Sequence, residues 1–255
     1  MIPLDLLKVV ICTPFLIYSC YSDLKIRKVS NQLWLIMISV GVPYVIYEYV
    51  YYHYGIQYLL RYLVSVLFIY VFVYFLFRLS AFGGADAKAL ITLSIIFPKF
   101  PEIDVFGYQF PITGVPILDL FAFSILGNAV ILPIFLPFVL FIYNLVNLSI
   151  EEIRQKPLYL FFAFKKDINK LQGHIKLIEE YKQIDGRVQA RFKWGMNEIT
   201  SDVIKELKDF EAKGLIEQKV WVTYKLPFMI PITAGFFTAV IFGDLIFFIL
   251  NIIFK

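Results

Sequence analysis

The sequence predicts a membrane protein, all-α in its membrane part, with six transmembrane helices and a small α+β domain inserted between helices five and six. Two observations predict this fold. Charged residues make up 17% of the 255-residue chain, against about 25% in ordinary soluble domains. The charge is also unevenly spread, because residues 1–148 and 226–255 are almost entirely apolar and residues 150–225 hold most of it. This pattern indicates a membrane body with one inserted polar domain.

Six apolar segments qualify, or nearly qualify, as membrane spans, since about 20 apolar residues cross a hydrocarbon core of ~30 Å. They are residues 3–22, 33–52, 58–77, 85–100, 120–145 and 228–254. The fourth segment is short and ends against Pro98 and Pro101. We therefore divide the chain into membrane helices one to five (residues 1–149), a soluble domain (150–225) and helix six (226–255).

The positions of lysine and arginine predict the orientation, because these residues favour the cytoplasmic side of a membrane. They concentrate in the loops after the first and third helices and in the inserted domain, which an alternating six-helix path places on one side. We expect that side to be cytoplasmic and both termini to lie outside. The net charge of +4 is modest, and we read the basic excess of the domain as a membrane-facing feature, not as a nucleic-acid site.

The inserted domain is predicted to contain both helix and strand. Asp185-Gly186 favours a tight hairpin turn, since this pair tolerates positive φ angles. A helix is expected from Glu198 to a stop at Gly214, because apolar residues recur at helical spacing; they are Ile199, Val203, Leu207 and Phe210. Residues 216–224 have the β-branched and aromatic content of a strand. We expect this small unit to lean on the membrane body for stability.

The sequence offers no sign of a metal site. Cys12 and Cys20 lie in the first apolar segment without further cysteine partners, whereas a zinc site usually needs four ligands. His53 and His174 are expected on opposite sides of the membrane, which argues against a histidine pair. We therefore expect chemistry that requires no metal and no cofactor.

Two aspartates carry the candidate chemistry. Asp23 ends the first apolar segment and Asp86 begins the fourth, so the alternating path places both on the cytoplasmic side. Two carboxyl groups held close together share one proton, because both cannot ionise cheaply. One can then activate water while the other polarises a carbonyl group. This arrangement predicts peptide hydrolysis without a covalent intermediate.

Each of these residues also has a purely structural interpretation. Asp86 can cap the fourth helix, and Asp23 can be an interfacial counter-ion for the basic residues that follow it. Lys88 either tunes Asp86 or anchors the topology while pointing elsewhere on its helix. Asn31 either forms a hydrogen bond near the site or caps the second helix. Gly83 and Gly84 remove side-chain bulk and so let another backbone approach Asp86.

The stretch Gly83-Gly84-Ala85-Asp86-Ala87-Lys88 resembles the Gly-x-Gly-Asp-x-Lys signature of type IV prepilin peptidases, with Ala85 in place of the second glycine. Asp23, the basic residues after it and Asn31 resemble the other half of that pattern. Order and pairing are most similar to the archaeal branch, the preflagellin and prepilin signal peptidases of the GxGD type. The resemblance implies that Asp23 and Asp86 are the catalytic pair.

The same resemblance implies a substrate and a location. The substrate would be a preflagellin or prepilin precursor, whose short basic leader is cut off at the cytoplasmic face of the cell membrane. The partners would be this precursor and the lipid bilayer, without nucleic acid. Bacterial relatives add a cysteine-rich zinc region and an N-methylating activity; with two cysteines, this chain is expected to be a peptidase without methyltransferase activity.

Two alternatives stay open from the sequence. One is a presenilin-like or signal-peptide-peptidase-like protease that cuts within transmembrane helices, loosely supported by the proline-containing stretch at residues 226–231. The other is a transporter or assembly scaffold with interfacial aspartates. The absence of an internal sequence repeat disfavours a transporter.

Overall fold

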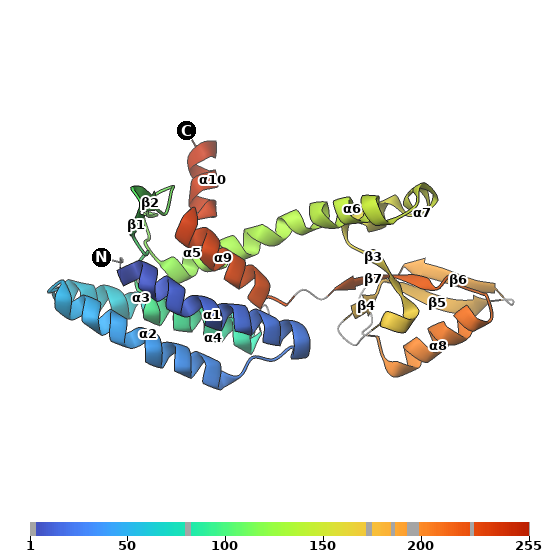
Figure 1. Cartoon of the computed structure of the whole chain (residues 1–255), viewed down its shortest axis with the longest axis horizontal. Helices are drawn as coiled ribbons and strands as arrows, with labels where there is room; N and C mark the ends of the chain where they lie inside the picture. Colours follow the sequence, from blue (N-terminus) through green and yellow to red (C-terminus); the bar gives the residue numbers. More distant parts are fainter. Residues whose placement is uncertain are drawn as a thin grey trace. The chain divides into compact units, whose positions relative to one another are not determined.

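The computed structural model describes residues 4–79, 83–171, 175–184, 187–192, 199–224 and 227–254 (Figure 1). The chain divides into two compact units, one made of residues 1–133 and 227–255 and the other of residues 134–226. The expected turn at Asp185-Gly186, the expected helix start at Glu198 and the position of His174 lie outside the described residues.

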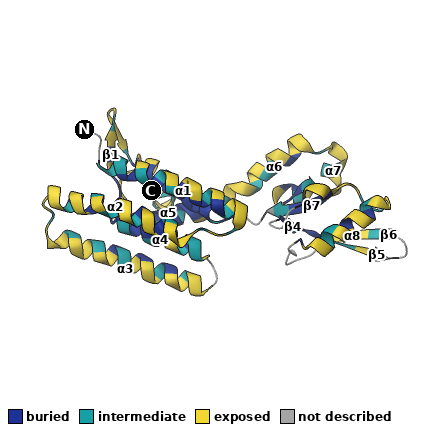
Figure 2. Ribbon diagram, turned by 60° about the horizontal axis from the view of Figure 1, so that its bottom comes forward, coloured by how far each residue is buried: buried dark blue, intermediate teal, exposed yellow. Residues whose placement is uncertain are grey.

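Three long apolar helices begin the first unit. They are α1 (Leu4–Ile26), α2 (Asn31–Tyr51) and α3 (Ile56–Arg78), joined by short connections. Each has at least 21 residues and therefore reaches about 30 Å at 1.5 Å per residue. Most of α3 is exposed in Figure 2, and only Ser65, Ile69 and Val73 are buried. A helix with such an apolar exposed surface is suited to contact lipid.

The fourth helix, α4 (Gly84–Ile96), is the buried centre of the first unit. It has 13 residues and packs against α2, α3 and α5 (Phe121–Ile131). Its buried apolar residues are Ala89, Leu90, Leu93 and Ile96. Gly41 of α2 permits this close packing, because a Cβ atom there would lie 2.7 Å from the Ile96 side chain. At about 20 Å, α4 is shorter than the span that we expected at residues 85–100.

A hairpin of β1 (Ile103–Val105) and β2 (Tyr108–Phe110) follows α4, and the chain then enters α5. The helix α5 continues through η1 (Leu132–Phe135) into α6 (Leu136–Asn147). The whole stretch Phe121–Asn147 has 27 residues and is apolar enough to cross a membrane. It corresponds to the expected fifth span at residues 120–145.

The expected sixth span, 228–254, is not one continuous helix. It consists of α9 (Met229–Ile241) and α10 (Leu245–Ile253), which meet at an angle of 61°. Asn128 of α5 satisfies the broken backbone: its side-chain nitrogen donates to the Gly243 carbonyl and its oxygen accepts from the Leu245 N–H, both at 2.9 Å. Asp244 caps α10 by accepting from the Phe247 N–H. The break is therefore a fully hydrogen-bonded feature of the fold.

The protein is a multi-pass membrane protein. Within the described residues, four helices are long and apolar enough to cross a bilayer, and the bent pair α9–α10 would make a fifth. The short helix α4 is outside that number. The six-span count therefore stays a prediction, since it requires α4 to cross the membrane together with its flanking residues.

The second unit contains α6, a small sheet, a hairpin and a helix. The strands β3 (Phe164–Asp167), β7 (Lys219–Tyr224) and β4 (Ile175–Leu177) form an antiparallel sheet in the order β3-β7-β4. The strands β5 (Glu179–Ile184) and β6 (Arg187–Phe192) form a hairpin in which Ile184 lies opposite Arg187. The remaining elements are α7 (Ile150–Gln155), η2 (Pro157–Phe161), η3 (Ile168–Lys170) and α8 (Ser201–Ala212).

This unit has a core of its own, built from the sheet, η3 and α8. Leu207 and Phe210 of α8 are buried, as the helical spacing predicts, and Gly214 follows the helix with a φ of 67°. The helix begins at Ser201 behind the cap Thr200, and the last strand begins at Lys219, so both elements are shorter than expected. The boundaries shift because capping and strand pairing, not composition, end an element.

The crossing of α5 and α9 yields a stability prediction. A Cβ atom on Gly235 of α9 would lie 2.5 Å from the Ile125 carbonyl oxygen and 2.9 Å from the Ala129 nitrogen, both backbone atoms of α5. Gly235→Ala should therefore lower the free energy of unfolding by about 1–3 kcal/mol, which thermal unfolding in detergent would measure. Gly127→Ala is the control, because its Cβ meets only the end of the Ile246 side chain, at 2.9 Å. Equal loss in both variants would contradict this interpretation.

Candidate active site

Asp86 lies in the first turn of α4 and is buried, with 7% of its surface exposed. Its Oδ2 atom accepts a hydrogen bond of 3.0 Å from the Gly83 N–H, which closes the start of the helix. The N-cap of α4 is Gly83 and Asp86 is the third helical residue, so the alternative in which Asp86 is the N-cap is wrong. The bond from the Gly83 N–H still closes the first turn and orients the Asp86 carboxyl group, which is compatible with a catalytic role.

Asp23 lies in the last turn of α1 and is half-buried. Its carbonyl oxygen accepts from the Arg27 N–H at 3.2 Å, and Arg27 has a left-handed φ of 55°, where α1 has ended. The Ser22 hydroxyl donates to the Lys28 carbonyl at 2.6 Å and holds the basic loop against the helix end. Asp23 is therefore part of a well-ordered helix terminus.

Asp23 and Asp86 come from two different helices, in the last turn of α1 and the first turn of α4. The end of α1 and the start of α4 lie at the same end of the first unit (Figure 1). Two carboxyl groups that approach closely in such a place cannot both ionise cheaply.

Lys88 and Asn31 join the starts of α4 and α2. The Lys88 ammonium group donates to Asn31 Oδ1 at 2.6 Å. The cap of α2 is Ser30, whose side chain accepts from the Gln32 N–H, and Asn31 is already the first helical residue. The alternative in which Asn31 caps α2 is therefore wrong. The Lys88 side chain bonds to Asn31 and not to Asp86, which is compatible with the expectation that it points elsewhere on its helix.

The small residues before Asp86 have different roles. Gly83 has an extended backbone with a φ of −77°, but a Cβ atom there would lie 3.0 Å from Asp86 Oδ2. At Gly84 the nearest contact of a Cβ atom would be Phe77 at 3.9 Å, an ordinary van der Waals distance. Ala85 is inside α4 and makes no demand for positive φ. Alanine therefore suits the third motif position in this chain.

Sequence reasoning missed the contribution of α9. The Cys20 thiol of α1 donates to Thr233 Oγ1 at 3.0 Å and to the Met229 carbonyl at 3.3 Å. This contact holds the first turns of α9 against α1, one helical turn before Asp23. The sequence carries no local signal for it, because Cys20 and Met229 are 209 residues apart.

The described residues contain no group of three or more histidine, cysteine or acidic side chains that could hold a metal ion. Cys12 and Cys20 are both free thiols.

Similarity to known proteins covers most of the chain. Residues 10–132 match the type IV leader peptidase family, and residues 155–245 match the archaeal peptidase A24 C-terminus, type II. The chain is similar to the preflagellin peptidase of Methanococcus maripaludis, with 27% identity over 90% of this chain and 92% of that protein. The preflagellin peptidases of Methanocaldococcus jannaschii and Methanococcus voltae are each 25% identical to this chain over 90% of its length. The matched regions make up 90% and 92% of those two proteins, respectively. The chain belongs to the type IV leader peptidase family.

Proposed function

We propose that this protein is an aspartic endopeptidase that removes the leader peptide from preflagellin or type IV prepilin-like precursors. Family membership and the three preflagellin peptidase relatives support a leader peptidase. The observation that carries the aspartic mechanism is the placement of two carboxyl groups at the ends of two different helices, Asp23 in the last turn of α1 and the buried Asp86 in the first turn of α4.

In the proposed mechanism the two carboxyl groups share one proton. The ionised group removes a proton from a water molecule as the water oxygen attacks the scissile carbonyl carbon. The protonated group donates its proton to the carbonyl oxygen, which gives a neutral tetrahedral intermediate. The C–N bond then breaks as the amine nitrogen takes up a proton from the pair, while the intermediate returns a hydroxyl proton. The pair ends with the one proton with which it began.

The neighbouring residues position this chemistry. The Gly83 N–H fixes the orientation of the Asp86 carboxyl group. The Lys88–Asn31 hydrogen bond holds the first turn of α4 beside the start of α2. Preorganised carboxyl groups lower the cost of reaching the reactive geometry. These contacts support the roles that the motif resemblance assigns to Gly83, Lys88 and Asn31.

The location of the substrate follows from the membrane. The apolar segment of a precursor can insert in the bilayer, so that the bond next to it reaches the helix ends that carry Asp23 and Asp86. The basic loops lie at the same end of the chain path, which supports a cytoplasmic active site, a cytoplasmic domain at residues 150–225 and outward termini. If the cut instead fell inside the apolar segment of the precursor, the protein would have the presenilin-like activity.

Asp23→Asn and Asp86→Asn should each lower the processing rate roughly 10³-fold or more, because the residues of a catalytic unit act together. The rate is measured with purified full-length protein in lipid vesicles and a leader-bearing precursor, with the cut mapped by mass spectrometry. Asp104→Asn, an exposed carboxylate in β1, is the matched control and should process normally. Near-normal processing by either site variant would refute the dyad.

Gly83→Ala should lower kcat by about 10- to 100-fold. The added Cβ atom would lie 3.0 Å from Asp86 Oδ2 and would push the carboxyl group out of its position. Gly84→Ala, with its nearest contact at 3.9 Å, should keep nearly full activity. Steady-state kinetics on the precursor compare the two. If Gly84→Ala were the more damaging change, the proposed orientation of Asp86 would be wrong.

Processing should not depend on a metal ion, because two carboxyl groups supply both proton transfers. Prolonged treatment with EDTA is expected to leave the initial rate unchanged, and added Zn²⁺ or Mg²⁺ should not raise it. Loss of activity in EDTA that returns on addition of a divalent ion would count against the mechanism.

A further inference from the structure

Lys8 of α1 is almost completely enclosed, with 2% of its surface exposed. Its ammonium nitrogen lies 2.6 Å from Asp5 Oδ1 and 2.8 Å from Glu48 Oε2 of α2. It also lies 5.3 Å from the centre of the Phe97 ring. An ionised side chain inside a membrane protein is costly unless charged partners surround it. Lys8 therefore belongs to a specific ion-pair cluster.

Glu48 connects this cluster to the chain after α4. It is 3% exposed, and its second oxygen lies 3.5 Å from the Lys99 ammonium nitrogen. Lys99 also donates to the Tyr54 hydroxyl at 3.3 Å. We call Asp5, Lys8, Glu48 and Lys99 the end clamp. Its two positive and two negative charges balance, so the whole cluster can be buried together.

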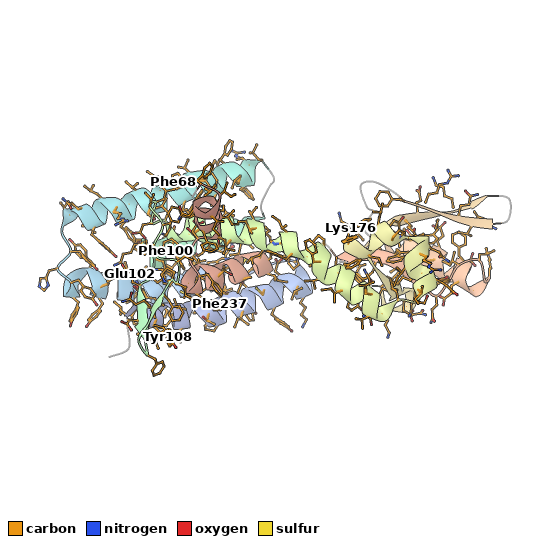
Figure 3. All side chains as sticks on the ribbon, turned by 90° about the horizontal axis from the view of Figure 1, so that it is seen from above. Phe68, Phe100, Glu102, Tyr108, Lys176 and Phe237 are labelled. Atoms are coloured by element: carbon orange, nitrogen blue, oxygen red, sulfur yellow. The ribbon has the colours of Figure 1, made fainter. Side chains whose placement is uncertain are left out.

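The segment that follows α4 is held at several further points. The Phe100 N–H donates to Asp119 Oδ1 at 2.7 Å, and Asp119 forms an ion pair with Arg61 of α3. The Glu102 N–H donates to Asp5 Oδ2 at 3.0 Å. Figure 3 labels Phe100 and Glu102 on this segment. Residues 97–102 are thus attached to α1, α2, α3 and the loop before α5.

These attachments matter because of the length of α4. A helix of 13 residues rises only about 20 Å. It cannot reach both membrane interfaces, whereas an ordinary span of ~30 Å has one end in each interface and these ends set its depth. Hydrogen bonds make the helix axially stiff, and the Phe97 N–H still bonds to the Leu93 carbonyl at 2.8 Å. Fixing one end of α4 therefore fixes the position of the first turn at its other end, where Asp86 lies.

We propose that the end clamp sets the depth of α4 and thereby places Asp86 against Asp23, so that Lys8, Glu48 and Lys99 are positioning residues. Its consequence for catalysis rests on the function proposed above. Stability alone does not explain why ionic groups are buried here, since a protein with well-packed apolar residues in place of a buried ion pair is often equally stable. Directional contacts of Glu48 to two lysines resist sliding of α4 in a way that apolar packing does not.

The test uses the double variant Lys8→Met/Glu48→Gln, which removes one charge of each sign and leaves Asp5 and Lys99. The matched control is Asp209→Asn/Lys213→Met, an exposed ion pair on α8. Both full-length proteins are reconstituted in vesicles. We expect the clamp variant to fold, with a kcat on the precursor at least tenfold lower and a KM within about twofold of the parent, whereas the control keeps both constants.

A second readout does not depend on activity. A single cysteine is placed at Ala87, beside Asp86, in a Cys12→Ala/Cys20→Ser background, and its reaction rate with a membrane-impermeant maleimide is measured. We expect the clamp variant to change this rate at least threefold and the control to leave it unchanged. If the clamp variant does not accumulate, Lys99→Met gives the same two readouts, since the Lys99 side chain is 24% exposed.

The outcomes separate the two proposals. A folded clamp variant with the parent kcat and the parent maleimide rate overturns the positioning role. A changed maleimide rate together with an active Asp86→Asn protein supports the clamp and overturns the dyad. A lower kcat with an unchanged maleimide rate also overturns the clamp, because the loss would then not arise from movement of α4.

Discussion

A buried polar group is costly without a partner, and ionic and hydrogen-bonded contacts of this kind surround one short helix of the first unit. α4 is largely buried, although Lys88 is exposed, and these contacts lie at both of its ends. At one end Glu48 connects Lys8 to Lys99. At the other end Lys88 bonds to Asn31, and Asp86 closes the first turn. Helices in lipid associate through close packing at small residues and through polar contacts. α4 has both, since it packs closely on Gly41 and has polar contacts at its two ends.

The same constraint explains the broken helix α9–α10. A backbone that leaves helical geometry within a membrane protein requires side chains that satisfy the freed groups. Asn128, fully buried, pairs with a carbonyl and an N–H on opposite sides of the break. The break ends α9 near the loop after the β1–β2 hairpin, since Ile112 and Thr113 donate backbone hydrogen bonds to its last carbonyls. A straight span could not make these contacts.

The proposed catalytic pair illustrates how a motif becomes a site. Asp86 is both the acceptor that closes the first turn of α4 and a candidate acid–base group, and its bond from the Gly83 N–H supplies the fixed orientation that chemistry needs. Gly83 has its role because of the distance from a would-be Cβ atom to the Asp86 carboxylate, not because of an unusual φ angle. The clamp at the far end of α4 would then determine where this prearranged group lies. Family membership accounts for the presence of the motif, whereas the contacts account for the residue type at its individual positions.

Hydropathy and local motifs predict the membrane character, the polar insertion, most helix positions and the candidate aspartates, because they report directly on each segment. Which side chains meet depends instead on how distant segments pack in three dimensions. Asn31 pairs with Lys88 and leaves the cap to Ser30, and the last apolar stretch bends by 61° where Asn128 can satisfy it. In the sequence Lys8 has only Asp5 as a nearby opposite charge, and the packing of α2 against α1 adds Glu48. Hydropathy averages along the chain, whereas such contacts depend on distances between segments that are far apart in sequence.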